Sequence, residues 1–310
     1  MNTATHGLSA DETAALTRRV TLLSVATALV LVSLKAIAWR ASDSVAMLAS
    51  MADSGLDLLA SLVTFFAVRY AVTPPDAEHR YGHGKVEAFA SLVQAGLVFA
   101  SAALIGQEAI GHLIRRQAVA NEGWAMAVMV VSLVLTAALV AAQGRVLKQA
   151  NSVAVSGDRA HYFSDFAANL AALAGLGAVA ATGWTGYDAI AGLVVAAVLL
   201  WAAINVFRES SGQLMDRELS DEARAEIVRL ATEEPQVLGV HQLRTRASGP
   251  YVHIQMHVDL DPDLSLQEAH RLVINAEQRV LSKFPAADLI IHPDPRGRAE
   301  PHGGAFAEND

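Results

Sequence analysis

The sequence has no cysteine and few charged residues. Without cysteine, disulfides and thiolate metal ligands are excluded, so a metal site in these 310 residues must use His, Asp or Glu. Charged residues make up only 17% of the chain and hydrophobic residues 53%, with a mean hydropathy of +0.33. The net charge of −8 and the lack of a clustered basic patch argue against a nucleic-acid partner. This composition favours a protein embedded in a lipid bilayer.

Long apolar runs fill most of the first two thirds of the chain. A helix needs about twenty mostly apolar residues to cross a hydrocarbon core of about 30 Å. Six runs meet this requirement: Val20 to Trp39, Ala46 to Val72, Ala88 to Ile114, Trp124 to Gln143, Ala160 to Thr182 and Tyr187 to Phe207. We therefore predict a membrane domain of six transmembrane helices over residues 20–212.

The positions of Lys and Arg between these runs predict the orientation. Positive residues are retained on the cytoplasmic side, and a cytoplasmic N-terminus leaves only Arg40, Arg115 and Arg116 outside. Residues 1–19 are too polar for a cleaved signal peptide and are expected to form a cytoplasmic segment. The chain is thus predicted to be a multi-pass membrane protein with both termini in the cytoplasm.

After Phe207 the sequence takes on the character of a soluble domain. An amphipathic helix is predicted after Ser220, strands over Val240–Arg246 and Tyr251–Leu260, a helix with Ser265 and Glu268 at capping-box spacing, and a strand over residues 287–292. The order helix, strand, strand, helix, strand suits a small α+β domain over residues 213–296, with two helices covering one face of a three-stranded sheet. Residues 297–310 are expected to be a disordered tail.

Two pairs of ionisable residues lie inside the predicted spans. Asp53 and Asp57 are four residues apart in one span, and His161 and Asp165 are four apart in another, so each pair lies on one face of a helix. Charges within a span are costly and are functional candidates. Facing each other, the two helices would offer three carboxylates and one imidazole, a tetrahedral set that suits Zn²⁺ and is also open to Fe²⁺, Co²⁺, Cd²⁺ or Mn²⁺. The alternative is that each pair caps a helix or bonds a neighbouring helix.

Asp158 and Asn169 flank the second pair by one helical turn on nearly the same face. Asp158 is interpreted as a helix N-cap, and Asn169 as an interhelical hydrogen-bond donor or a partner of a ligand. Neither is predicted to be a ligand.

Two further clusters of histidine and aspartate lie outside the spans. Asp76, His79 and His83 follow a Pro pair in "TPPDAEHRYGHGKVE", where three ligands could reach one ion, although loop histidines are usually only exposed. The C-terminal domain holds His241, His253, His257, His270 and His292, with Asp294 close behind. A pH sensor or core histidines could explain one or two of them, but a multinuclear metal site explains the group more economically.

Six motifs together resemble the cation diffusion facilitator family, in particular its bacterial YiiP-type zinc and iron exporters, from about residue 15 to 296. The motifs are "ADSGLD", "DAEHRYGHGKVE", "HYFSD", "HQLRTRASGP", "IQMHVDL" and "IIHPDP". The resemblance implies a homodimer, six membrane helices and a metallochaperone-like cytoplasmic domain. That fold agrees with the αββαβ order expected from the sequence pattern.

The resemblance also implies roles for particular residues. The transport site would be Asp53, Asp57, His161 and Asp165; the loop site Asp76, His79 and His83; and the cytoplasmic binuclear site His241, His257, His270, His292 and Asp294, with Asp294 bridging. His253 departs from the family, whose members tend to have an apolar residue there. Lys85 and Asp216 match a charge pair that ties the membrane helices to the cytoplasmic domain; the alternative is an exposed pair of little energetic value.

We therefore expect a secondary transporter and not an enzyme: a proton-coupled antiporter that exports divalent metal, most readily Zn²⁺. Metal and H⁺ compete for the same ligands, because a ligand must lose its proton to bind metal. One alternative is a membrane-embedded metal hydrolase, but no H-E-x-x-H helix or evident general base is present. The other is a membrane-anchored metal sensor, for which six spans are excessive.

Overall fold

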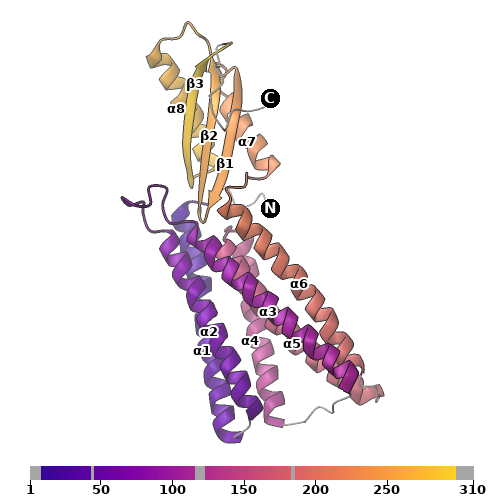
Figure 1. Cartoon of the computed structure of the whole chain (residues 1–310). Helices are drawn as coiled ribbons and strands as arrows, with labels where there is room; N and C mark the ends of the chain where they lie inside the picture. Colours follow the sequence, from indigo (N-terminus) through magenta and orange to yellow (C-terminus); the bar gives the residue numbers. More distant parts are fainter. Residues whose placement is uncertain (1–7, 43–44, 116–122, 183–185, 298–310) are drawn as a thin grey trace.

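The computed structural model describes residues 8–42, 45–115, 123–182 and 186–297. It consists of a bundle of long helices and a smaller α+β domain at one end of that bundle (Figure 1). The segments 1–7 and 298–310 lie outside the described residues. The predictions of a cytoplasmic N-terminal end and of a disordered C-terminal tail therefore stay predictions.

The bundle contains the six helices expected from the apolar runs. They are α1 (Ala10–Ser42), α2 (Val45–Ala71), α3 (Val86–Arg115), α4 (Gly123–Leu147), α5 (Val153–Thr182) and α6 (Gly186–Leu214). By length and composition, five of them could cross a membrane, within the described residues. The sixth, α5, is 30 residues long but carries polar residues such as Asp158, His161 and Asp165, which lower its hydropathy.

Helix α1 differs from its expected bounds. It begins at Ala10 and not near Val20, so most of the segment expected to precede the first span is helical. Ser9 explains the early start, because its Oγ accepts the backbone N–H of Glu12 while the Glu12 carboxylate accepts the backbone N–H of Ser9. This reciprocal capping box is a strong N-terminal signal.

The helices are packed most closely at the end next to the α+β domain. Helices α3, α5 and α6 contact one another, α1 pairs with α2, and α4 lies against α1 and α5. In Figure 1 the α1–α2 pair and the α3–α6 pair diverge toward the far end of the bundle. A buried apolar cluster holds the near end together: Val20, Ala67, Val68, Ala90, Ala154 and Val155.

The C-terminal domain has the expected order of elements: α7 (Asp221–Thr232), β1 (Gly239–Ser248), β2 (Tyr251–Leu260), α8 (Leu266–Lys283) and β3 (Ala287–Pro295). The sheet order is β1-β2-β3, with β1 and β2 antiparallel and β2 and β3 parallel. Both helices cover one face, where Ile227, Ile254, Met256 and Val280 are buried together. The capping box of Ser265 and Glu268 is present at the start of α8, as expected.

The two parts of the chain meet at two glycines. A Cβ added to Gly84, just before α3, would lie 2.0 Å from the carbonyl oxygen of Ser248, the last residue of β1 before the β1–β2 turn. Gly249 in that turn has a φ of +57°, a left-handed conformation that side chains rarely adopt. Glycine at both positions therefore lets the α2–α3 loop contact the β1–β2 turn backbone to backbone.

Candidate metal centres

The first candidate centre lies between α2 and α5 inside the bundle. Asp57, His161 and Asp165 each offer a ligand atom, and these atoms all lie within 4.8 Å of one another. Asp57 is 7% exposed and His161 is 5% exposed. The Nε2 atom of His161 lies 3.0 Å from Oδ1 of Asp57. The structure thus brings together an imidazole and two carboxylates in a largely buried site, a donor set that can hold a transition-metal cation.

Asp53, the fourth ligand expected here, is not part of this group. It lies one turn before Asp57 on α2, farther from the C-terminal domain, and it is exposed. Lys35 of α1 binds the same turn of α2, because its Nζ donates to Ser54 Oγ at 2.6 Å and to the Ser50 carbonyl at 3.2 Å. A site with four ligands would require Asp53 to turn toward the other three residues.

Asp158 was interpreted as an N-cap, and this is wrong. Helix α5 begins at Val153, so Asp158 lies inside the helix, and it is fully buried. It accepts a hydrogen bond of 2.8 Å from Gln143 of α4. Asn169 is half-buried one turn beyond Asp165.

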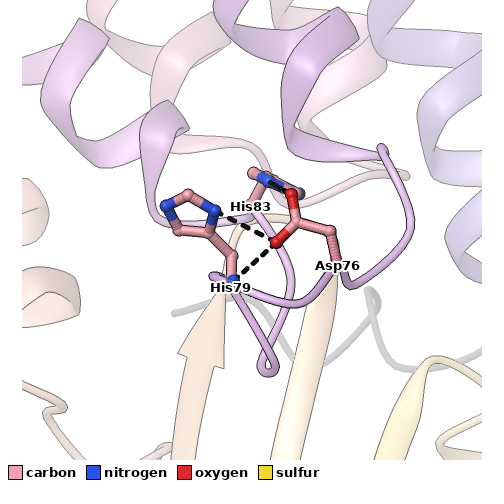
Figure 2. Close-up of side chains that lie close together, drawn as sticks. All are labelled: Asp76, His79 and His83. Carbon is pink, nitrogen blue, oxygen red and sulfur yellow. Dashed lines mark hydrogen bonds and ion pairs between the residues drawn. The ribbon is translucent and has the colours of Figure 1, made fainter.

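The second candidate centre lies in the loop between α2 and α3 (Figure 2). Asp76 lies between two imidazoles: His79 Nδ1 is 3.3 Å from Oδ1 and His83 Nε2 is 3.3 Å from Oδ2. The His83 ring is buried, and its Nδ1 lies 3.2 Å from the carbonyl oxygen of Thr73. With a proton on Nδ1 bonded to that carbonyl, Nε2 is free to bind a cation beside Asp76.

The Asp76 carboxylate is prepared to act as a ligand. Its Oδ1 accepts the backbone N–H groups of His79 and Glu78 at 2.6 and 2.9 Å. The hydrogen bond from His79 is the main reason why the pKa of Asp76 is lower than usual. Asp76 is therefore ionised at neutral pH and presents its charge to both histidines.

The third candidate centre is formed by the register of the sheet. His241 of β1 lies opposite His257 of β2, which lies opposite His292 of β3, and Asp259 lies opposite Asp294. Strand alternation directs these side chains to the face that α7 and α8 leave uncovered. The sheet thus aligns residues of three strands that lie far apart in the chain.

Asp294 is the centre of this cluster. Its Oδ2 lies 2.8 Å from Nδ1 of His257 and 3.4 Å from Nε2 of His241, and its Oδ1 lies 3.4 Å from Nε2 of His292. Both carboxylate oxygens face imidazole nitrogens, the arrangement expected of a bridging ligand. Asp259, which the sequence interpretation missed, lies 3.8 Å from Nε2 of His241. Its position two residues after His257 on the same strand face could have identified it.

Two other histidines of this domain lie elsewhere. His270 is exposed on α8 and is not part of the described group that could hold a metal. His253 is buried on β2, where its Nδ1 lies 3.1 Å from Oδ2 of Asp288. Tyr81 of the α2–α3 loop contacts the His253 ring edge-on.

A charge network links the bundle to the C-terminal domain. Lys85 Nζ lies 2.9 Å from Oδ1 of Asp216, and it also donates to the carbonyl oxygen of Leu214. Arg246 of β1 donates to Oδ2 of Asp216 at 3.2 Å. Burial alone would raise the pKa of Asp216, but the hydrogen bond and charge of Lys85, together with Arg246, hold it below its usual value. Asp216 thus joins the start of α3 to the sheet.

A bundle of membrane-length helices with buried cation ligands, joined to an α+β domain with a second ligand cluster, defines a membrane transporter of metal cations. Comparison with known families agrees: residues 21–215 match the cation efflux transmembrane domain, and residues 219–296 match the cytoplasmic domain of cation efflux proteins. The chain belongs to the cation efflux family, also called the cation diffusion facilitators.

Similar proteins match nearly the whole chain. A cation-efflux pump named FieF from Shewanella oneidensis is 43% identical over 272 residues, covering 88% of this chain and 92% of the relative. FieF of Klebsiella pneumoniae is 38% identical over 280 residues, covering 90% and 93%. Among solved structures, the zinc form of CzrB is 31% identical and covers 27% of this chain and 98% of that chain, with a TM-score of 0.26.

Family membership establishes the general function of the chain and the side of the membrane on which its α+β domain lies. The chain is a multi-pass membrane protein that exports metal cations, and its α+β domain is cytoplasmic. It is a transporter, so the alternatives of a membrane-embedded hydrolase and of an anchored sensor are set aside. The cytoplasmic end of the bundle is the end at which Gly84 and Lys85 contact this domain.

Proposed function

We propose that the protein is a homodimeric antiporter of the inner membrane that exports Zn²⁺ in exchange for protons. The observation that carries this proposal is the buried group of Asp57, His161 and Asp165. One imidazole with carboxylates is a borderline donor set that favours Zn²⁺ over hard cations such as Mn²⁺, while Fe²⁺, Cd²⁺ and Co²⁺ fit the same donors. A shift of Asp53 toward the group would complete four ligands.

The contact between His161 and Asp57 supports proton coupling. At 3.0 Å from Asp57, Nε2 of His161 either carries a proton that it donates to the carboxylate or binds a cation with its lone pair. The ordinary pKa of histidine, about 6.5, lies where cytoplasm and exterior can differ in pH. Protons arriving from outside would therefore displace the metal, and metal from the cytoplasm would displace the protons.

The other two centres fit supporting roles. Asp294 faces three imidazoles with both oxygens, a donor set suited to two zinc ions in the cytoplasmic domain. His270, exposed on α8, would have to join them from its separate position. The loop group of Asp76, His79 and His83 would hold a further ion next to the junction of the two domains. The ions of the cytoplasmic domain would stabilise the dimer. Both termini of each protomer would lie in the cytoplasm.

Flux measurements in proteoliposomes test the proposal. Uptake of Zn²⁺, Fe²⁺, Cd²⁺ and Co²⁺ is measured with and without a pH gradient, for the wild type, Asp57→Ala and the control Asp263→Ala, which removes an exposed carboxylate of the cytoplasmic domain. We expect the gradient to drive Zn²⁺ uptake in the wild type and the control but not in Asp57→Ala. Equal flux in Asp57→Ala would refute the site, and uptake indifferent to the gradient would refute the coupling.

A further inference from the structure

A fully buried polar network lies immediately on the cytoplasmic side of the metal ligands. Its centre is Asp158 of α5, one helical turn before His161, and none of its side chains is more than 1% exposed. The other members come from five helices: Ser24 (α1), Ser61 and Thr64 (α2), Gln94 (α3), Gln143 (α4) and Tyr162 (α5).

Two amides from different helices donate to the same carboxylate. Gln143 Nε2 lies 2.8 Å from Oδ2 of Asp158, and Gln94 Nε2 lies 3.4 Å from Oδ1. Ser61 donates to Oδ1 at 3.5 Å. An ionised carboxylate only accepts hydrogen bonds, so it is suited to a position where donors approach from several helices. Asp158 therefore links α2, α3 and α4 to α5 at one point.

The same donors extend the network to the remaining helix and back to α2. Gln143 also donates to Ser24 Oγ at 3.1 Å, and the Tyr162 hydroxyl lies 3.3 Å from the Ser24 carbonyl oxygen and 2.7 Å from Ser61 Oγ. Gln94 also donates to Thr64 Oγ1 at 2.9 Å. Helices α1 and α5 therefore cannot separate here without breaking hydrogen bonds in a water-free interior, where unpaired polar groups are costly.

An apolar layer closes the bundle on the cytoplasmic side of this network. Val20, Ala67, Ala90 and Ala154 are buried together there, each at most 6% exposed. On the other side of the ligands, Asp53 is exposed and the helix pairs diverge (Figure 1). The ligands are thus separated from the cytoplasm by two packed layers, while the opposite side is less tightly closed.

We propose that Asp158 is a positioning residue that locks the cytoplasmic entrance to the metal site. The hydrogen bonds of this network hold the five helices α1–α5 together on the cytoplasmic side of Asp57 and His161 when the ligands face outward. These hydrogen bonds must break when a cation enters from the cytoplasm. This inference rests on the proposed alternation between two sides, which requires one entrance to be closed whenever the other is open.

Single-cysteine labelling tests the lock, because the chain has no native cysteine. Ala90→Cys places a reporter in the apolar layer, and Asn169→Cys places one beyond the ligands on the outer side. Each reporter is combined with Asp158→Ala, Asp158→Asn or the control Ser132→Ala, which removes a buried α4 hydroxyl that has no hydrogen-bond partner among the described residues. Labelling rates with a polar maleimide are measured in lipid nanodiscs without metal.

We expect Asp158→Ala to raise labelling at position 90 by about fivefold or more and to lower it at position 169, because the population shifts toward the inward-open arrangement. Asp158→Asn should have a smaller effect, since its amide retains part of the hydrogen bonding, and Ser132→Ala should have none. The proposal is overturned if Asp158→Ala changes neither rate, if it raises both, which would mean a loosened bundle, or if Asp158→Asn equals it. The readout is accessibility and not flux, so a failed lock and a failed proton-coupled export are distinguishable.

Discussion

At the scale of single residues, the chemistry of the candidate transport site depends on one nitrogen. Asp57 and Asp165 supply hard oxygen donors, whereas His161 supplies the only imidazole of the group. Imidazole ligands suit zinc, iron and copper, while all-carboxylate sets suit magnesium, calcium and manganese. The identity of residue 161 should therefore set which cations are carried.

His161→Asp is expected to shift selectivity toward manganese. An all-oxygen site should raise the ratio of Mn²⁺ to Zn²⁺ uptake by about tenfold, a change of about 1.4 kcal/mol in relative affinity. The measurement is competitive uptake of the two ions into proteoliposomes. His253→Ala, which removes a histidine distant from the bundle's ligands, serves as the control. An unchanged ratio in His161→Asp would mean that the imidazole does not select the cation.

At the scale of elements, Lys85, which immediately precedes α3, and Glu87 in the first turn of α3 connect three parts of the molecule. Lys85 binds Asp216 at the base of the cytoplasmic domain, and Glu87 accepts a hydrogen bond from Ser152 at the start of α5. Ser152 Oγ also accepts the backbone N–H of Val155 in the first turn of that helix. The Glu87 carboxyl lies at the N-terminus of α5, where the backbone N–H groups favour an acceptor. The contacts at the N-terminal end of α3 therefore position both the cytoplasmic domain and α5, the helix that carries His161.

The contact between Glu87 and Ser152 should stabilise the bundle cooperatively. Glu87→Ala and Ser152→Ala should each lower the free energy of unfolding by about 1–3 kcal/mol, since each leaves a buried polar partner unpaired. The double variant should cost less than the sum, by about 1 kcal/mol. The free energies of unfolding of the wild type, the two single variants and the double variant are measured in detergent micelles and compared as a double-mutant cycle. As a control, Glu87→Ala is combined with Ser211→Ala, which removes a half-buried hydroxyl that donates to the Arg208 carbonyl of its own helix; the two effects should be additive. Additivity in the Glu87–Ser152 cycle would show that the contact contributes nothing.

The link between Lys85 and Asp216 should persist over a wide pH range. Because the pKa of folded Asp216 lies below its usual value, the stabilisation is present above the unfolded pKa and is lost as pH falls through the lower, folded value. Both side chains are partly exposed, so the pair contributes only about 1 kcal/mol or less. Fluorescent labels at Glu78→Cys and Gln255→Cys should report one narrow distance distribution from pH 8 down to about pH 4, and a broader one below.

Asp216→Asn provides the comparison for that measurement. Without the carboxylate charge, the distance distribution should already be broad at pH 7 and should change little on acidification. A wild-type distribution that broadens near pH 6 would attribute the link to a histidine and contradict the assignment to Asp216.

At the scale of the whole molecule, the cytoplasmic cluster can act on the transport domain only through contacts between domains. The sheet carries Asp294 and its histidines on its uncovered face, and its β1–β2 turn contacts Gly84 ahead of α3. Metals that bind one arrangement of the dimer better than another shift the population toward it, by no more than their differential affinity.

Removal of the Asp294 carboxylate should uncouple metal binding from dimer closure. In the wild type, Zn²⁺ should shorten the distance between spin labels at Gln278→Cys in the two protomers. In Asp294→Ala, the Zn²⁺ concentration needed for the same change in distance should be at least about ten times higher. His241→Ala should behave similarly, whereas His253→Ala should behave as the wild type. Closure with unchanged zinc dependence in both His241→Ala and Asp294→Ala would exclude a sensing role.

Much of this protein is determined by the sequence alone, for identifiable physical reasons. Apolar runs of membrane length predict the six helices, since only helices of that length satisfy their backbone in lipid. Strand alternation and the capping box at Ser265 predict the order of the cytoplasmic elements. The i, i+4 spacing of Asp53 with Asp57 and of His161 with Asp165 identifies α2 and α5 as the helices of the candidate transport site, because charged residues within a span are costly and are functional candidates.

Only the tertiary structure decided which of these residues meet. Spacing along one helix cannot show that Asp57 faces His161 across the bundle while Asp53 remains exposed. The alignment of His241, His257 and His292 depends on strand register, and the role of Asp158 depends on amides from two other helices. Local pattern fixes the face on which a side chain lies, because that follows from helix and strand geometry. The partner across the interface follows from packing of distant segments, which no local pattern contains.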